Sequence, residues 1–271
     1  MEVLGDTIEQ IAWNKAGIIK SGAPCITGAS DEAQRVLRQA AQEVGAPLVD
    51  ARPVVLAHST SLHGQRVDLQ VAGTTYRGLE VSLLGRHQVQ NAAVALAALE
   101  AARRRGLSLS DEAIREGLRY ARWPGRFEVW DADAPSPVVL DCAHNEASMA
   151  ALAATVNEYF PGRKAVVVLG MLADKEVEQA IRHLVPHMRA AVATTPSSPR
   201  ALGADRMAAM IPPTMVAAVE PDPKTALIQA RRILRVGELL LITGSCYLVG
   251  PLRRALAPHP WLPRAEPDSG L

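Results

Sequence analysis

The sequence predicts an α/β protein whose C-terminal half forms a doubly wound, mostly parallel, Rossmann-like sheet. From about residue 128 onward, short apolar runs alternate regularly with segments of helical length. Strands of a parallel sheet are buried on both faces, so they read as continuous apolar runs rather than as alternating patterns. The expected strands are 138–140, 165–169, 190–194, 216–219 and 239–243, with helices at about 146–159, 175–184, 203–210, 222–235 and 246–256.

In the N-terminal part of the chain, helical patterns alternate with short strands. Asp6 or Thr7 is suited to cap a helix that runs to Lys15. A short buried strand is expected at 24–27, followed by a helix at about 31–44. This part therefore also predicts an α/β arrangement, although its strands are fewer and shorter.

Residues 66–81 have the pattern of a β-hairpin, because apolar residues alternate with polar ones on both sides of a turn at Gly73. An alanine-rich segment at 88–104 predicts a long helix. Ser110 is suited to cap another helix at 111–120.

A rigid linker divides the two parts. In the segment 122–126, Pro124 stops the preceding helix and Gly125 frees the backbone. We therefore expect two domains, 1–125 and 126–271.

The composition is that of a soluble globular protein. The 271 residues are 48% hydrophobic and 21% charged, and the formal net charge is only +1. A chain that binds nucleic acid or an anionic membrane usually carries a basic face, which this balance does not suggest. The N-terminus lacks the pattern of a signal peptide, and no apolar run approaches the roughly 18 residues of a membrane span, so a cytoplasmic protein is expected.

The three cysteines predict free thiols. Cys25, Cys142 and Cys246 are far apart, odd in number and without a CxxC spacing. Free buried thiols in a reducing cytoplasm are the simplest interpretation. Neither a GxGxxG nor a GxxxxGK[ST] motif occurs, which argues against a dinucleotide-binding enzyme and an independent nucleotide hydrolase.

Two segments of the first domain are candidates for function. Lys15 lies on the side of its helix that looks buried, near the end, where a lysine that complements the helix C-terminus is the alternative. His87 and Asn91 are four residues apart and so share one face of the helix that begins there. Asn91 is suited either to cap that helix or to read the edge of a nucleobase.

Two further candidates lie near the start of the second domain. Arg126 follows a rigid turn, and its guanidinium suits a phosphate or, alternatively, a salt bridge between domains. Asp141 comes directly after a buried strand, at the sheet edge where ligands of open α/β folds bind. His144 and Asn145 then lie at the start of the next helix, and this combination of polar groups favours function over packing.

Three more segments follow predicted strands of the second domain and should meet at the same sheet edge. They are 169–175, 199–202 and 244–250. Gly244-Ser245, at a strand–helix turn, is suited to bind an anion through backbone N–H groups, or to form a tight turn with a serine cap.

Taken together and in chain order, these segments resemble the folylpolyglutamate synthase/dihydrofolate synthase family of the Mur ligase superfamily. The resemblance covers nearly the whole chain, and seven segments in order are far more specific than any one alone. The matching segments are LGDTIEQIAWNKAGI, LLGRHQVQNA, WPGRFEV, LDCAHN, GMLADKE, PRAL and GSCYLVG.

The resemblance implies an ATP-dependent ligase that adds L-glutamate to a folate or a dihydropteroate through an acyl phosphate, with ATP and Mg²⁺ as cofactors. It implies a Rossmann-like C-terminal glutamate-ligase domain, preceded by a truncated remnant of the family's central ATP-binding domain that contains the hairpin. By the same resemblance Asn91, with His87 beside it, would contact adenine. Arg126 would contact the ATP phosphates, Asp141 the ribose, and His144 the phosphates or the incoming glutamate.

The chain also departs from the family pattern. Lys15 would be carbamylated and help to hold Mg²⁺ indirectly, but Asn14 replaces the glutamate that usually precedes it. The glycine-rich phosphate loop is missing, and Met1 stands just after the place of the family's metal-binding histidine. We therefore expect a monomer that is inactive alone, for which a chain carrying the phosphate loop would be the natural companion.

Two other functions fit the same residues. One is a non-catalytic module that binds nucleotide or glutamate. The other is a Mur-type ligase that acts on a cell-wall precursor, although the hairpin and the PRAL and GSCYLVG segments favour the folate branch.

Overall fold

The computed structural model describes residue 5, residues 7–173 and residues 177–256. The chain forms two compact units, Met1–Arg122 (the N-terminal unit) and Trp123–Leu271 (the C-terminal unit), each with a hydrophobic core of its own. None of the helices in the described ranges is long and apolar enough to span a bilayer.

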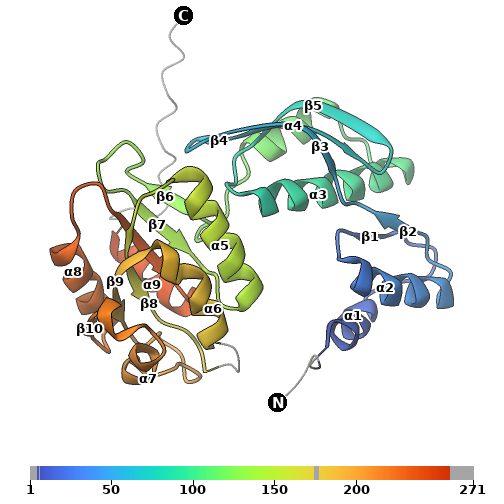
Figure 1. The fold of residues 1–271 in the computed structure, drawn as a ribbon. Helices are drawn as coiled ribbons and strands as arrows, with labels where there is room; N and C mark the ends of the chain where they lie inside the picture. The colour runs from blue at the N-terminus through green and yellow to red at the C-terminus, as the bar shows by residue number, and fades with distance from the viewer. Residues whose placement is uncertain (1–4, 6, 174–176, 257–271) are drawn as a thin grey trace, which may run out of the picture. The chain divides into compact units, whose positions relative to one another are not determined.

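The N-terminal unit begins with a small α/β segment (Figure 1). The hydroxyl of Thr7 accepts a hydrogen bond of 3.2 Å from the N–H of Gln10 and so caps the first helix. The alternative cap, Asp6, lies outside the described residues. The elements of this segment are α1 (Ile8–Ala16), β1 (Cys25–Thr27), α2 (Asp31–Glu43) and β2 (Leu48–Asp50), and the two strands pair in parallel. The short strand β2 was not predicted.

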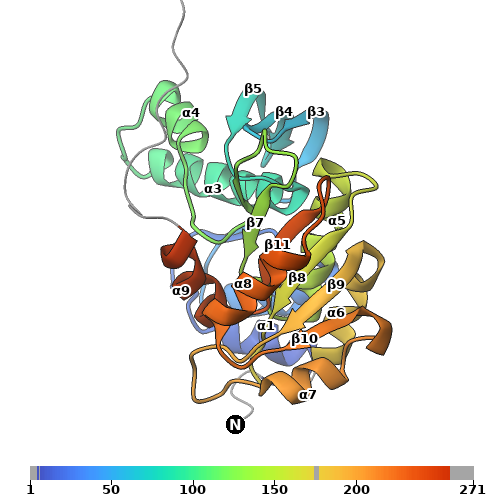
Figure 2. The same cartoon turned by 90° about the vertical axis from the view of Figure 1, so that its left-hand side faces the viewer.

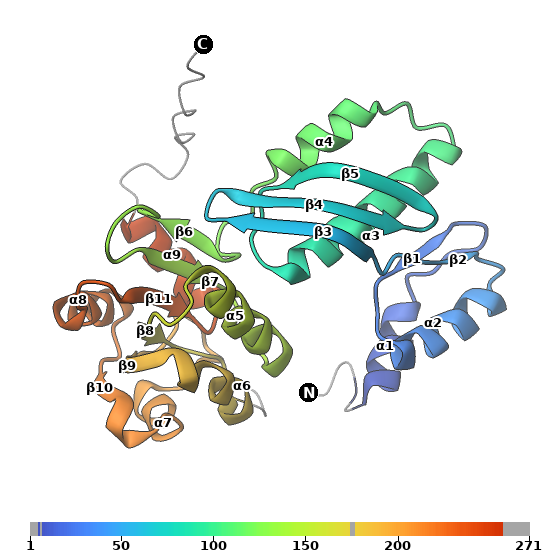
Figure 3. The ribbon, with the colours of Figure 1, turned by 45° about the horizontal axis from the view of Figure 1, so that its top comes forward.

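A three-stranded antiparallel sheet follows, where the sequence predicts only a hairpin (Figure 3). Its strands are β3 (Val54–Ser61), β4 (Gly64–Val71) and β5 (Thr74–Val81). The hairpin of β4 and β5 is present. β3 was missed because its residues are exposed at almost every position, so it carries no alternating apolar pattern.

Two helices complete the N-terminal unit, α3 (Arg86–Arg104) and α4 (Asp111–Arg119). Ser110 caps α4 by accepting the N–H of Ala113 at 3.0 Å, as predicted. α3 begins two residues earlier than predicted, directly after Gly85, whose φ of +101° is the conformation that suits glycine. Buried side chains of the sheet and of α3 share one core, among them Val67, Leu69, Leu79, Val89 and Leu96.

The C-terminal unit is built on one six-stranded sheet, in the order β10-β9-β8-β11-β7-β6. Five strands run parallel to their neighbours, and only the edge strand β6 is antiparallel, to β7. The strands are β6 (Glu128–Trp130), β7 (Val138–Asp141), β8 (Ala165–Leu169), β9 (Met188–Ala193), β10 (Val216–Val219) and β11 (Leu239–Thr243). The predicted doubly wound, mostly parallel sheet is confirmed, while the short edge strand β6 was not predicted.

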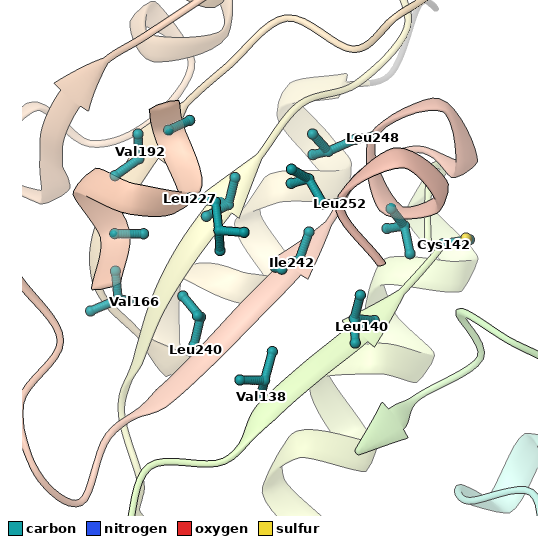
Figure 4. Packing of buried hydrophobic residues seen from close by; sticks show 14 residues of the cluster. Val138, Leu140, Cys142, Val166, Val192, Leu227, Leu240, Ile242, Leu248 and Leu252 are labelled. Carbon is teal, nitrogen blue, oxygen red and sulfur yellow. The ribbon is translucent and has the colours of Figure 1, made fainter. Parts of the chain in front are cut away.

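Helices cover both faces of this sheet (Figures 1 and 2). They are α5 (Glu146–Tyr159), α6 (Val177–Leu184), α7 (Ala204–Ala209), α8 (Pro223–Ile233) and α9 (Cys246–Leu256). The first two residues of the predicted helix 175–184 lie outside the described residues. α8 and α9 pack on one face, in a cluster to which Leu140, Ile242 and Leu252 belong (Figure 4). α5 and α6 lie on the other face.

One largely buried ion pair joins the first strand of the C-terminal unit to its last helix. Arg253 donates hydrogen bonds to both carboxylate oxygens of Glu128, at 2.8–3.0 Å. The Trp130 indole and the Gly125 N–H donate to the same carboxylate. Burial alone would raise the pKa of Glu128, but these hydrogen bonds hold the pKa below its ordinary value.

We predict that replacing Arg253 by alanine lowers the free energy of unfolding of the C-terminal unit by about 2 kcal/mol at neutral pH, because the substitution leaves the Glu128 carboxylate without its charged donor. Urea denaturation followed by circular dichroism measures the change. Because the pKa of Glu128 is lower in the folded state, the contribution of the pair is present above about pH 4.3 and is lost as the pH falls further.

The matched control is Arg254→Ala, which removes the same charge from the exposed neighbouring position and should change the stability by less than about 0.5 kcal/mol. Equal losses in the two variants would contradict the structural role given to the pair.

Candidate functional site

The neighbouring strands β7 and β11 send the helices that follow them to opposite faces of the sheet. α5 follows β7 on one face, and α9 follows β11 on the other (Figure 2). In open α/β sheets, ligands bind at the carboxyl ends of the strands where the connections diverge in this way. The parallel register aligns Asp141 with Thr243, so the turns after both strands lie at this edge.

Asp141 ends β7 as a buried carboxylate that accepts two backbone hydrogen bonds. The N–H of Phe127 donates to Oδ2 and the N–H of Ala143 donates to Oδ1, both at 2.8 Å. Phe127 has a φ of +43°, a left-handed conformation that is uncommon for an aromatic residue. The carboxylate therefore stabilises an unfavourable backbone conformation directly next to Arg126.

The pKa of Asp141 reflects these surroundings. Burial raises the pKa to about 6, although the two amide donors and the charges of Arg126 and His144 act in the opposite direction. Arg126, and His144 when its ring is protonated, are thus close enough for their fields to act on the carboxylate. The structure brings together the three site residues expected in this unit, Arg126, Asp141 and His144.

Arg126 is exposed on a tight turn whose backbone is closed by a hydrogen bond from its N–H to the carbonyl of Trp123, at 3.2 Å. The turn requires Gly125, because φ is +72° there and a Cβ would lie 2.9 Å from the Sγ of Cys142. Within the C-terminal unit, no described carboxylate forms an ion pair with Arg126. Its guanidinium can therefore bind an anionic group of a ligand.

His144 has a defined orientation at the start of α5. Its Nδ1 lies 2.9 Å from the carbonyl oxygen of Cys142. A carbonyl only accepts, so Nδ1 carries the hydrogen, and Nε2 of the neutral ring is left as an acceptor. Asn145 is committed to capping, since its side chain accepts the N–H of Ser148 while the Ser148 hydroxyl accepts the N–H of Asn145.

The turn after β11 forms the other side of this edge. Gly244 has a φ of +113°, and a Cβ there would lie 2.5 Å from the carbonyl oxygen of Gly170. The hydroxyl of Ser245 accepts the N–H of Tyr247 at 3.1 Å, which is the serine-cap alternative. The hydroxyl of Thr243 is buried and has no hydrogen-bond partner among the described residues. Most buried polar groups in proteins have such a partner, so this hydroxyl is an exception at the same sheet edge.

Arg126 and the start of α9 also line a cavity of about 180 Å³. Its other lining groups include Trp123, Cys142 and Cys246. The segments WPGR, LDCAHN and GSCYLVG, which are far apart in the sequence, thus meet at one place.

The GMLADKE and PRAL segments, which follow strands of the same sheet, are joined by backbone hydrogen bonds. The N–H of Leu202 donates to the carbonyl of Met171, and the N–H of Ala173 donates to that of Arg200, both at 2.9 Å. The PRAL segment therefore lies against the residues that follow β8. The end of the GMLADKE segment, residues 174–176, lies outside the described residues.

In the N-terminal unit, Lys15 is exposed in the last turn of α1, which corrects the expectation of a buried-looking position. The buried residues of this helix are Ala12 and Ala16, so the packed face does not include the lysine. No described side chain or backbone group bonds to its amine. A cation in this turn complements the negative end of the helix dipole.

His87 and Asn91 lie on α3 and are linked by the buried Gln88. The amide nitrogen of Asn91 donates to Gln88 Oε1 at 3.0 Å, and Nε2 of Gln88 lies 3.1 Å from Nε2 of His87. The capping alternative for Asn91 is wrong, because α3 begins five residues earlier and Gly85 occupies the cap.

Several participants were not anticipated from the sequence. Gln88 follows His87 directly, yet only the folded helix shows that it connects His87 to Asn91. Phe127 carries no polar side chain, and its part in the site is its backbone N–H. The proximity of Cys142 and Cys246 follows from the register of β7 and β11, for which the sequence gives no local signal.

Family and sequence comparisons agree with one another. Residues 125–246 match the family model of the Mur ligase, glutamate ligase domain. The chain is 34% identical over 261 residues to the dihydrofolate synthase/folylpolyglutamate synthase of Bacillus subtilis, covering 94% of this chain and 60% of that protein. It is 36% identical over 222 residues to the protein of that name from Mycobacterium tuberculosis, covering 77% of this chain and 45% of the relative.

Solved structures agree as well. The folylpolyglutamate synthase of Mycobacterium tuberculosis complexed with ADP and AMPPCP matches with a TM-score of 0.82 at 30% identity, over 96% of this chain and 62% of that one. A bifunctional folylpolyglutamate synthase/dihydrofolate synthase with Mn, AMPPNP and L-glutamate bound matches with a TM-score of 0.77 at 30% identity, over 93% and 58%. The chain thus spans about three-fifths of the length of these two structures.

We predict that the carboxyl group of Asp141 titrates near pH 6 in the folded protein. The folded state then holds this proton more tightly than the unfolded chain, so the contribution of the group to stability is present below about pH 4 and is lost as the pH rises through about 6. Carbon-13 NMR of labelled aspartate carboxyl groups measures the titration.

Asp222, the cap of α8, is the internal control, because hydrogen bonds from Thr225 hold its pKa below the ordinary value. Titration of Asp141 together with Asp222 in the acid range would contradict the effect of burial.

Proposed function

Since the chain belongs to the folylpolyglutamate synthase/dihydrofolate synthase family, we propose that it acts in the ATP-dependent attachment of L-glutamate to a folate or a dihydropteroate. In this reaction a carboxylate is first activated as an acyl phosphate, and the glutamate amine then displaces phosphate to form an amide. The names of the relatives favour the folate branch over a cell-wall precursor.

The observation that carries the proposal is the cluster at the carboxyl end of β7. An exposed guanidinium with no ion-pair partner among the described residues of its unit stands beside a carboxylate and an imidazole, at the position where α/β sheets bind ligands. Arg126 is suited to bind the phosphates. His144, with Nε2 free to accept, is suited to the phosphates or to the amine of the incoming glutamate.

Asp141 retains capacity for a ribose. A carboxylate has about four acceptor positions, and the amides of Phe127 and Ala143 use one on each oxygen. Ribose hydroxyls can donate to the others. On α3, the amide of Asn91 is exposed and, with His87, is suited to the edge of adenine. Each unit, taken by itself, therefore carries groups that are suited to part of a nucleotide.

The residues present do not by themselves fit a divalent metal. Among the described residues, no group of three or more His, Cys, Asp or Glu side chains is placed to hold an ion. Lys15, the residue that the family resemblance assigns to the metal, is exposed on α1, and no described group bonds to its amine. A carbamylated lysine would supply one oxygen ligand, whereas Mg²⁺ takes six.

The incomplete metal site favours a second candidate, a module that binds nucleotide or glutamate without turnover by itself. A single assay distinguishes the two candidate functions. Incubation with ATP, Mg²⁺, a reduced folate and glutamate releases phosphate only if this chain performs the ligation. We expect this chain alone to bind nucleotide without turnover. Release of phosphate that depends on both folate and glutamate would show instead that the chain's own residues suffice for the ligation.

We predict that Arg126→Ala weakens the binding of AMPPNP at least about tenfold, because a charge-assisted contact to phosphate contributes about 1.5–3 kcal/mol. Isothermal titration calorimetry in the presence of Mg²⁺ measures the affinity, and circular dichroism verifies the fold.

The control is Arg232→Ala, which removes an exposed arginine from the last turn of α8, just before β11 and so at the amino end of the sheet. It should leave the affinity unchanged. If the unmodified chain does not bind AMPPNP, the ligase and a nucleotide-binding module both fail. If both variants bind equally well, Arg126 is not a phosphate ligand.

A further inference from the structure

Two cysteines meet at the carboxyl edge of the C-terminal sheet. Cys142 follows Asp141 directly, and Cys246 is the first residue of α9. Because Asp141 and Thr243 are partners in register, the turns that carry the cysteines lie side by side. Both cysteines line the cavity of about 180 Å³, and the neighbouring Cys246 adds to the effect of burial in raising the pKa of the Cys142 thiol.

The two thiols differ in accessibility. Cys246 is exposed, whereas Cys142 is only 7% exposed and belongs to the cluster that includes Leu248 and Leu252 of α9 (Figure 4). Cys142 is also tightly confined. Its N–H donates to the carbonyl of Gly125 at 2.8 Å, and its Sγ lies 2.9 Å from the position that a Cβ of Gly125 would take.

We propose that Cys142 and Cys246 form an oxidisable dithiol, a modification site at which a hydroperoxide converts the two thiols into one intramolecular disulfide. The exposed thiol meets the oxidant, and the buried thiol beside it resolves the product. An accessible cysteine next to a resolving cysteine is the arrangement typical of redox-sensing sites. This inference depends on the geometry of the C-terminal unit and not on the proposed function.

The chemistry balances with hydrogen peroxide as the co-reactant. The Cys246 thiolate attacks one peroxide oxygen, the O–O bond breaks, and sulfenic acid and water are formed. The Cys142 sulfur then attacks the sulfenic sulfur, its proton leaves with the departing hydroxide as a second water, and the S–S bond forms. Two thiols and one peroxide give one disulfide and two waters, so both sulfurs are oxidised and the peroxide is reduced.

The resolving step should depend on pH. Burial raises the pKa of the Cys142 thiol, and the thiolate is the better nucleophile. The resolving step should therefore accelerate as the pH rises. Once formed, the disulfide fastens the turn that carries Asp141 and His144 to the first turn of α9.

Peptide mapping tests the proposal on the full chain. The protein is treated with hydrogen peroxide, its remaining thiols are alkylated, and it is digested with trypsin without reduction. We expect the peptides spanning 127–163 and 236–253 to be recovered as one cross-linked species that dithiothreitol separates. The apparent melting temperature should rise on oxidation and return on reduction, because a cross-link between distant positions restricts the unfolded chain.

Two single variants serve as matched controls. Cys25→Ala removes the cysteine of the N-terminal unit and should keep the cross-link, whereas Cys246→Ala changes an exposed residue and should abolish it. Recovery of the two peptides apart, with Cys246 over-oxidised or untouched, would overturn the proposal, and so would a cross-link that includes Cys25.

A second measurement does not require oxidation. Phenylarsine oxide bridges two neighbouring thiols, and in the reduced Cys25→Ala protein one equivalent should protect both remaining cysteines from alkylation. Protection of neither thiol would show that the sulfurs are not neighbours in solution.

Discussion

The site in the C-terminal unit depends on the buried carboxylate of Asp141. By accepting the N–H of Phe127, this carboxylate stabilises a left-handed aromatic residue and so fixes the turn that presents Arg126. By accepting the N–H of Ala143, it fixes the first residues after β7, which lead to His144. One side chain thus positions Arg126 before it in the sequence and His144 after it, although the two segments are separated by the strands β6 and β7 and the loop between them. The cost of burying the carboxylate appears in its raised pKa.

Glu128 lies near the same turn, and its net pKa shift has the opposite sign although burial acts on both carboxyl groups in the same direction. Its pKa is lowered, whereas that of Asp141 is raised. The difference lies in the donors. Arg253 gives Glu128 a full positive charge in two-pronged contact, which outweighs desolvation, while Asp141 receives only neutral amides directly and feels the charges of Arg126 and His144 from further away. The pairing of Arg253 with Glu128 also has a consequence for Arg126, because it occupies a nearby carboxylate and leaves the Arg126 guanidinium for a ligand.

The sequence predicted the parallel sheet well because buried strands such as 165–169 and 239–243 are continuous apolar runs, and this signal is local. β3 and β6 were missed for the converse reason, since exposed or very short edge strands carry no such run. Among the site residues, Asp141 and His144 could be placed because a polar residue directly after a buried strand falls at the ligand edge. Lys15 could not, because helical spacing shows which residues share a face but not which face is packed. The neighbours Glu128–Arg253 and Cys142–Cys246 come together only through strand register and helix packing over long sequence separations.

The two turns at the ligand edge are held by different means, and this difference explains the setting of the cysteine pair. The turn after β7 is held by hydrogen bonds to the Asp141 side chain, so its neighbour Cys142 has little freedom. The turn after β11 is held by close backbone packing, because Gly244 approaches the carbonyl of Gly170 too closely for any other residue. Neither support involves a sulfur atom. A bond between Cys142 and Cys246 would therefore join two turns that are each held by contacts other than those of the sulfur atoms. The same rigidity that presents Arg126 and His144 to a ligand thus also holds the two thiols at one cavity.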